Sequence, residues 1–172
     1  AQTATGKVEV VEFFWYGCPH CYAFEPKLQA WASKLPPHVQ FTRVPVVFRP
    51  YEYPNHQKLY YTLELLGKLG DLHAKVFDSF HQLGKRIESP EAAADFAAAN
   101  GIDRKKFLDV FGSFRVQGLC NRANQMMKDY SVKGVPALAV AGRYMTDVGM
   151  NGGSEAKTLA TVDALVAASR GK

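Results

Sequence analysis

One short stretch carries most of the information in this sequence: Phe13-Phe14-Trp15-Tyr16-Gly17-Cys18-Pro19-His20-Cys21. It closes an apolar run that predicts a buried strand over residues 7–16. After Gly17, apolar residues recur at helical spacing, which predicts a helix over residues 19–35. Two cysteines therefore stand where a strand turns into a helix. Pro19 falls near the first helical position, where its missing N–H has no intrahelical partner in any case.

This placement has a chemical consequence for Cys18. The unpaired backbone N–H groups at a helix N-terminus, together with the positive end of the helix dipole, stabilise a nearby anion. The Cys18 thiol should therefore ionise more readily than a free thiol. With the Cys21 thiol one helical turn away, the pair has what thiol–disulfide exchange requires.

A bare Cys-x-x-Cys pair can also be half of a zinc site or a structural disulfide. A structural zinc ion needs four ligands, and the third cysteine, Cys120, lies about 100 residues away without a partner. The five histidines show no paired ligand spacing around it. The position at a strand-to-helix turn further favours redox chemistry, so no metal site is expected.

His20 lies between the two cysteines and is expected to tune them. Its imidazole can offer a hydrogen bond or a positive charge to the Cys18 sulfur, which favours the thiolate. The alternative is an exposed loop histidine without a role. Cys21 should be less exposed than Cys18, as suits the second thiol of such a pair.

The bulk composition is that of a soluble globular protein. The 172 residues are 47% hydrophobic and 22% charged, enough for one domain or for one domain with an insertion. No segment approaches the roughly 20 apolar residues of a membrane span. The net charge is +5, but the basic residues are scattered and their longest cluster is residues 104–106, so nucleic acid is not an expected partner. The polar opening, residues 1–6, fits a processed secretory product or a trimmed chain equally well.

A second strand is predicted over residues 39–48. Its alternation places Arg43 in the same row as Val39 and Phe41, and Pro45 argues for an edge strand or a bulge. The first strand is apolar on both faces, as in a parallel sheet covered on both sides. Glu12 is the exception in it, either at the strand's edge or buried, and Arg43 is its candidate partner.

The middle of the chain reads as helical. Residues 51–55 look like a loop, and no convincing strand follows for about 75 residues. The apolar and aromatic residues of this block, Leu83 and Phe114 among them, are expected in its core. The domain division is therefore an inserted helical subdomain over residues 51–127 within an α/β domain formed by residues 1–50 and 128–172.

The last part of the chain returns to strand character. Residues 135–140 and 143–148 are expected to form a hairpin about Ala141-Gly142. A flexible loop is expected over residues 149–153, and Ser154 should cap the last helix.

Four segments together resemble the DsbA family of bacterial periplasmic disulfide oxidoreductases: Glu12-Phe13-Phe14, Cys18-Pro19-His20-Cys21-Tyr22, Phe24-Glu25 and Gly134-Val135-Pro136-Ala137. The resemblance covers nearly the whole chain. It implies a thioredoxin-like fold with an inserted helical subdomain. It also implies an enzyme, a protein thiol:disulfide oxidoreductase that donates its disulfide to newly exported proteins, with no cofactor beyond the Cys18–Cys21 disulfide.

The resemblance extends to individual residues. Cys18 corresponds to the family's nucleophilic cysteine and Cys21 to its buried partner. Val135 and Pro136 match the loop whose proline is cis and presents backbone to an extended substrate, and Pro19 is expected at the same surface.

The resemblance also implies a place for a proton. Glu12 matches the family's buried acid and Glu25 a second nearby carboxylate, both able to relay a proton as Cys21 leaves. Arg43 stands where the family often has lysine; it cannot deprotonate, so it can pair with Glu12 without sharing its proton. Gly17 stands where a larger residue is familiar.

The implied partners are unfolded or nascent exported polypeptides and a quinone-linked, DsbB-like membrane protein that reoxidises the pair. The chain is expected to be a monomer in the periplasm, with its signal peptide removed. Alternatives are a reductase or isomerase on the same fold, a glutathione-dependent transferase, and a non-enzymatic zinc-binding module. Cys120 is expected to be buried and inert; if exposed, it would be a site of dimer formation or oxidation.

Overall fold

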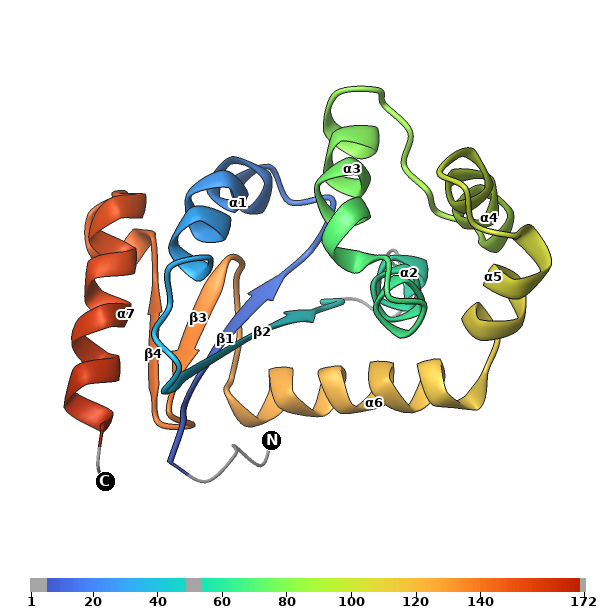
Figure 1. Cartoon of the computed structure of the whole chain (residues 1–172). Coiled ribbons are helices and arrows are strands. Elements are labelled where there is room, and N and C mark those ends of the chain that lie inside the picture. The colour runs from blue at the N-terminus through green and yellow to red at the C-terminus, as the bar shows by residue number, and fades with distance from the viewer. Residues whose placement is uncertain (1–5, 49–53, 171–172) are drawn as a thin grey trace. The chain divides into compact units, whose positions relative to one another are not determined.

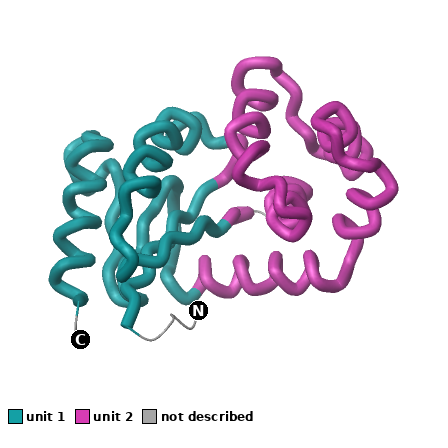
Figure 2. Tube along the Cα trace, viewed as in Figure 1, with its two compact units in different colours: residues 1–14, 18–44, 129–172 teal, residues 15–17, 45–128 magenta. Residues whose placement is uncertain are grey.

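The computed structural model describes residues 6–48 and 54–170, and the contacts divide the chain into two compact units (Figures 1 and 2). The first unit comprises residues 1–14, 18–44 and 129–172, and the second comprises residues 15–17 and 45–128. The sequence divided the chain at 50/51 and 127/128, and the first of these boundaries lies outside the described residues. Residues 15–17 are the difference that matters for the site, because they pack with the helical unit.

The first unit is built on a four-stranded sheet of order β2-β1-β3-β4. Its strands are β1 (Val8–Phe14), β2 (Val39–Pro45), β3 (Ala137–Val140) and β4 (Tyr144–Asp147). β1 is buried at every residue because it is a central strand. The expectation of a parallel sheet around β1 is wrong on the β3 side, where the strands pair antiparallel, from Val10 opposite Val140 to Phe13 opposite Ala137. β2 is an edge strand, as Pro45 indicated.

Two helices, α1 (Pro19–Ala32) and α7 (Glu155–Ser169), pack on one face of this sheet (Figure 1). Their apolar side chains form one buried cluster with Val8 and Val10 of β1 and with Leu138 and Val140 of β3. Side chains alternate along a strand, so Glu12 shares the face of Val8 and Val10. This alternation places a carboxylate under α1.

Several elements are shorter than predicted. β1 ends at Phe14, and the next three residues pack with the helical unit. β2 ends at Pro45 and α1 ends at Ala32. The expected flexible loop over residues 149–153 contains a short 3₁₀ helix, η1 (Gly149–Asn151), whose Met150 N–H donates to Asp147 Oδ1 at 2.7 Å.

Every regular element described in the second unit is a helix. They are α2 (Pro54–Leu65), α3 (Leu69–His81), α4 (Pro90–Ala99), α5 (Arg104–Phe111) and α6 (Phe114–Asp129). Pro54 and Asn55 begin α2 rather than ending a loop, and residues 51–53 lie outside the described part. No helix in the described ranges is long and apolar enough to cross a membrane.

Leu59, Leu63 and Phe107 are fully buried, as the helical periodicity predicted. Three core predictions in this unit are wrong, and one of them is Leu108 of α5, which is 36% exposed. Leu83 is 64% exposed and Phe114 is 96% exposed. Leu83 lies beyond the last residue of α3 and Phe114 is the first residue of α6, so neither is held on the face that its helix buries.

Candidate active site

Cys18 is the N-cap of α1, with extended backbone, and Pro19 occupies the first turn. The Cys18 sulfur accepts a hydrogen bond from the backbone N–H of Cys21 at 3.2 Å. This is the position that Ser or Asp takes in an ordinary cap, satisfying an N–H that has no intrahelical acceptor. A sulfur held there is better stabilised as an anion than as a neutral thiol.

These contacts lower the pKa of Cys18 to about 6. The largest cause is the hydrogen bond from the Cys21 thiol, followed by the N–H groups of Cys21 and His20 and by the charge of His20. Burial of Cys18 opposes them, but the donors outweigh it. At neutral pH the sulfur is therefore mostly thiolate.

Cys21 lies in the first turn of α1 and is fully buried, whereas Pro19 and His20 are exposed. The two cysteines are not joined by a disulfide in this structure. Cys21 is thus less exposed than Cys18, as predicted, and Cys18 is the cysteine that an incoming group can reach first. The structure leaves the catalytic roles of Cys18, Cys21 and His20 as predictions.

Val135 and Pro136 lie on the other side of the Cys18 sulfur. The sulfur is 3.7 Å from the Val135 carbonyl oxygen, and the Val135–Pro136 peptide bond is cis. A pocket of about 540 Å³ has His20, Val135, Pro136, Asp147 and Gly149 in its lining. Two predicted site segments, the Cys-x-x-Cys turn and the Val135-Pro136 loop, thus meet at one surface.

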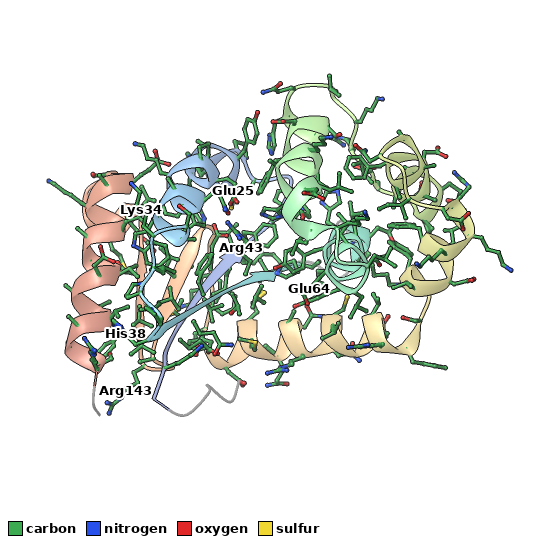
Figure 3. All side chains as sticks on the ribbon, viewed as in Figure 1. Glu25, Lys34, His38, Arg43, Glu64 and Arg143 are labelled. Atoms are coloured by element: carbon green, nitrogen blue, oxygen red, sulfur yellow. The ribbon has the colours of Figure 1, made fainter. Side chains whose placement is uncertain are left out.

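Glu12 of β1, Glu25 of α1 and Arg43 of β2 form one group, in which both carboxyl groups are buried and Arg43 is half-buried. Arg43 Nη2 donates to Glu25 Oε1 at 2.7 Å, and its Nε lies 3.6 Å from Glu12 Oε1. Figure 3 shows the labelled Glu25 and Arg43 side chains pointing toward one another. The predicted pairing of Glu12 with Arg43 is present, and Arg43 bridges two carboxylates.

Glu12 is the unusual member of this group. It is 1% exposed, and within residues 6–48 and 54–170 neither of its carboxylate oxygens has a hydrogen-bond partner. Burial raises its pKa well above the usual range, with the charges of Glu25 and Cys18 adding to the effect and Arg43 opposing it. The carboxyl group of Glu12 therefore holds a proton to higher pH than an exposed glutamate does.

Cys120 stands apart from this site. It is buried in the helical unit, as predicted, and burial raises the pKa of its thiol to about 11. That it is unreactive stays a prediction. Among the described residues, no group of three or more His, Cys, Asp or Glu side chains is arranged to hold a metal ion.

Comparison with known proteins places this geometry in a family. Residues 9–162 match the model of the DSBA-like thioredoxin domain. The chain belongs to this family. It is 45% identical over 161 residues to the thiol:disulfide interchange protein DsbA of Azotobacter vinelandii, covering 94% of this chain and 74% of the relative. It is 44% identical to the DsbA of Pseudomonas aeruginosa, with 94% and 75% coverage.

Solved DsbA structures confirm the fold class. The crystal structure of Pseudomonas aeruginosa DsbA superposes with a TM-score of 0.92 at 42% identity, covering 98% of this chain and 87% of that one. The DsbA of Xylella fastidiosa gives a TM-score of 0.89 at 33% identity, with 98% and 89% coverage. The thioredoxin-like fold with a helical insertion is therefore confirmed, and so is the resemblance to the DsbA family.

Some residues of this DsbA-family site were missed from sequence. Gln29 accepts a hydrogen bond from Arg43 at 3.0 Å, and its place four residues after Glu25 on α1 was the available signal. Asp147 and Gly149 line the pocket beside Val135. Both residues belong to a segment that is distant from His20 in the sequence and comes near it only in the fold. No local sequence pattern could therefore have predicted them.

Proposed function

We propose that this chain is a thiol:disulfide oxidoreductase that donates its Cys18–Cys21 disulfide to newly exported proteins. The single observation that carries the proposal is the Cys18 sulfur at the N-terminus of α1, where it accepts the Cys21 N–H and its pKa falls to about 6. Whatever stabilises the thiolate stabilises the reduced form of the pair. A pair whose reduced form is favoured is a strong oxidant of other dithiols.

The exchange proceeds in two displacements. A substrate thiolate attacks the Cys18 sulfur, the Cys18–Cys21 bond breaks, and Cys21 leaves as a thiolate and takes up a proton. The second substrate thiolate then attacks the substrate sulfur of the mixed disulfide, and Cys18 leaves as a thiolate. The substrate loses two electrons and gains a disulfide, while the enzyme ends as a dithiol. The low pKa of Cys18 makes it a good leaving group in the second step.

Glu12 is proposed to supply the proton that Cys21 takes up, with Glu25 as the neighbouring carboxylate. Glu12 is buried, its pKa is raised, and it has no hydrogen-bond partner in the described residues to hold its charge. Arg43 remains charged throughout. Its role is to keep the two carboxylates in place and to limit how far the pKa of Glu12 rises.

The substrate polypeptide is proposed to lie along Val135 and Pro136, with Pro19 and His20 on the opposite side. The Val135 carbonyl next to the Cys18 sulfur offers a backbone acceptor to an extended chain. Such a contact recognises the main chain of the substrate rather than its side chains. It therefore suits an enzyme that must accept many unfolded substrates.

The partners follow from the chemistry of the cycle. Each turnover leaves the pair reduced, so a quinone-linked membrane protein of the DsbB kind is proposed to reoxidise it. Donated disulfides persist only in an oxidising compartment, and we propose that for this chain the compartment is the periplasm. The chain is proposed to act as a monomer, without nucleic acid and with no cofactor beyond its own disulfide.

The decisive experiment measures the reduction potential of the Cys18/Cys21 pair in a Cys120→Ser background, equilibrated against glutathione. We expect a potential well above that of the glutathione pool, where each 30 mV corresponds to about 1.4 kcal/mol for this two-electron couple. A potential near or below the pool would point to a reductase instead. No redox transition, with stoichiometric zinc bound, would support the zinc-binding alternative.

A further inference from the structure

The pocket that His20, Val135 and Pro136 line also contains two acidic residues. Among the residues described in its lining, Asp147 and Glu155 are the acidic ones, and no lysine or arginine is present. The chain as a whole carries a net charge of +5, so these two charges have the opposite sign to that of the molecule. The exchange mechanism above uses neither carboxylate.

Asp147 is held in place by the segment that follows it. It is the last residue of β4, and its Oδ1 accepts the Met150 N–H at 2.7 Å. A Cβ on Gly149 would lie only 3.2 Å from the same oxygen, so the chain passes close beside the carboxylate. No described residue forms an ion pair with Asp147. Because a carboxylate can accept several hydrogen bonds, this fixed group keeps acceptors for a further donor.

Glu155 is the first residue of α7, and it has a partner that a ligand can replace. Lys27 Nζ of α1 lies 3.3 Å from its Oε1, and the Lys27 side chain is 59% exposed. An ion pair that is open to water contributes little stability. Lys27 therefore weakens the charge of Glu155 without removing the acidic character of the pocket.

The pocket continues directly from the reactive sulfur. The Val135 carbonyl oxygen lies 3.7 Å from the Cys18 sulfur, and Val135 and His20 both line the pocket. Asp147 and Glu155 belong to the same compact unit as Cys18. Side chains of an extended chain alternate in direction, so a substrate joined to Cys18 and lying along Val135 turns one neighbour of its cysteine toward the pocket.

We infer that Asp147 and Glu155 are specificity residues, which favour a substrate with lysine or arginine next to the cysteine that reacts with Cys18. The inference rests on the proposed function and names a substrate preference within it. The cation of such a side chain forms a charge-assisted hydrogen bond with the Asp147 carboxylate and replaces Lys27 at Glu155. The preference is modest because the pocket is open to water, so other sequences remain substrates.

The test measures kcat/KM for short reduced peptides with two cysteines, oxidised by the Cys120→Ser protein. Each peptide carries the same guest residue, arginine, glutamine or glutamate, beside both cysteines, first on the N-terminal and then on the C-terminal side. Each value is divided by the rate at which oxidised glutathione oxidises the same peptide, because a guest charge also changes the pKa of the peptide thiol.

We expect the arginine peptide to exceed the glutamate peptide by about three- to tenfold on one of the two sides, as partly exposed ion pairs imply. The glutamine peptide should lie between them. The preference should shrink in 0.5 M sodium chloride, which screens exposed charges. Equal values on both sides, or a preference for glutamate, would overturn the inference.

Three variants assign the preference to residues. Asp147→Asn keeps an oxygen for the Met150 N–H but removes the charge, and it should bring the ratio of arginine to glutamate close to one. Glu155→Gln should lower the ratio less. Lys27→Gln removes the competing cation and should raise the ratio. If Asp147→Asn does not fold, the opposite changes in Glu155→Gln and Lys27→Gln decide, and changes of the same sign would contradict the inference.

Asp109→Asn is the matched control. It removes one negative charge from an exposed residue of α5, outside the lining of the pocket, and should leave the ratio unchanged. A fall as large as that in Asp147→Asn would assign the effect to net charge and overturn the inference. The reduction potential of Asp147→Asn should equal that of the parent, because Cys21 and His20 lower the pKa of Cys18. A shifted potential would mean that Asp147 acts on the redox pair instead.

Failure of this inference and failure of the proposed function are distinguishable. If the parent protein has an oxidising potential and oxidises all the peptides at equal normalised rates, the function stands and the inference fails. If the parent oxidises none of them, the proposed function fails before any variant is compared.

Discussion

At the scale of single residues, the pKa of Cys18 reflects two opposing effects: burial, which raises it, and hydrogen-bond donors, which lower it. Burial alone would raise the pKa of its thiol, as it does for Cys120. The difference between the two cysteines is the helix N-terminus, which aims N–H groups at one sulfur and not at the other. Position in an element, rather than burial, therefore separates the cysteine with a lowered pKa from the one with a raised pKa.

The first prediction concerns the pH dependence of Cys18 reactivity. In the reduced Cys120→Ser protein, the rate of alkylation by iodoacetamide should rise with pH about a midpoint near 6, the pKa of Cys18. His20→Ala should move this midpoint upward, since His20 contributes an N–H and a charge, and the charge is lost. His38→Ala, which changes a histidine absent from the contacts of Cys18, should leave it in place. The measurement is the alkylation rate at each pH, followed by mass spectrometry. A midpoint at the pKa of a free thiol would contradict a lowered Cys18 pKa.

At the scale of elements, Arg43 ties three of them together. Its guanidinium on β2 contacts Glu25 and Gln29 on α1 and lies beside Glu12 on β1. All of this occurs within the face that α1 covers, where an unpaired charge is costly. Arg43 thus adds a polar link between α1 and the sheet to the apolar packing of Phe24 and Leu28.

The second prediction tests this link. Arg43→Met should lower the free energy of unfolding by about 3 kcal/mol at pH 7, because it leaves buried carboxylates without their cation. The loss should shrink at acidic pH, where protonation removes the charge that Arg43 compensates. Arg43→Lys keeps a cation and should cost less. Urea unfolding at both pH values is the measurement.

Arg104→Met is the control for Arg43→Met. It breaks the ion pair with Asp95, in which both partners are well exposed, and should change the stability by less than about 0.5 kcal/mol. If the two substitutions cost the same, the buried cation has no special role.

At the scale of the whole molecule, the charge on Cys18 links stability to redox state. The folded reduced protein has a Cys18 pKa of about 6, below the ordinary value of 9.0. A lowered pKa contributes stability that is fully present above the unfolded value and is lost as the pH falls through the folded value. The oxidised protein has no thiol at this position and lacks this contribution.

The third prediction concerns how the stability difference between the reduced and the oxidised protein changes with pH. Between about pH 6 and about pH 9 the reduced protein should gain stability relative to the oxidised protein as the pH rises. Below pH 6 the difference should level off. Urea unfolding midpoints of the two forms, measured across this range in the Cys120→Ser background, test it. Parallel curves for the two forms would contradict a thiolate stabilised by the fold.

Local patterns made much of the site predictable from sequence. Helical spacing after Gly17 and a proline after Cys18 predicted the cap position of the sulfur. Strand alternation placed Arg43 in an apolar row, and that row faces Glu12. Each of these features is encoded within about ten residues, which is the range over which periodicity carries information.

Features set by distant residues were not predictable. A fully buried strand is a continuous apolar run whether its neighbours are parallel or antiparallel. The antiparallel pairing of β1 with β3 could therefore not be predicted from residues 8–14. Trp15 and Tyr16, which follow β1, hydrogen-bond with histidines 41 and 57 positions away, and no local pattern encodes those contacts. Asp147 reaches the pocket beside His20 only through the hairpin that carries it.

The way the chain passes between its two units affects how the molecule can be recombined. Residues 15–17 pack with the helical unit although Phe14 and Cys18 on either side belong to the sheet unit (Figure 2). The helical unit therefore cannot be exchanged whole by cutting only at 44/45 and 128/129, because it also includes the three residues that precede Cys18. A chimera between relatives that exchanges residues 45–128 alone would separate Trp15 from its own His56. Exchanging residues 15–17 with them would transfer the unit whole.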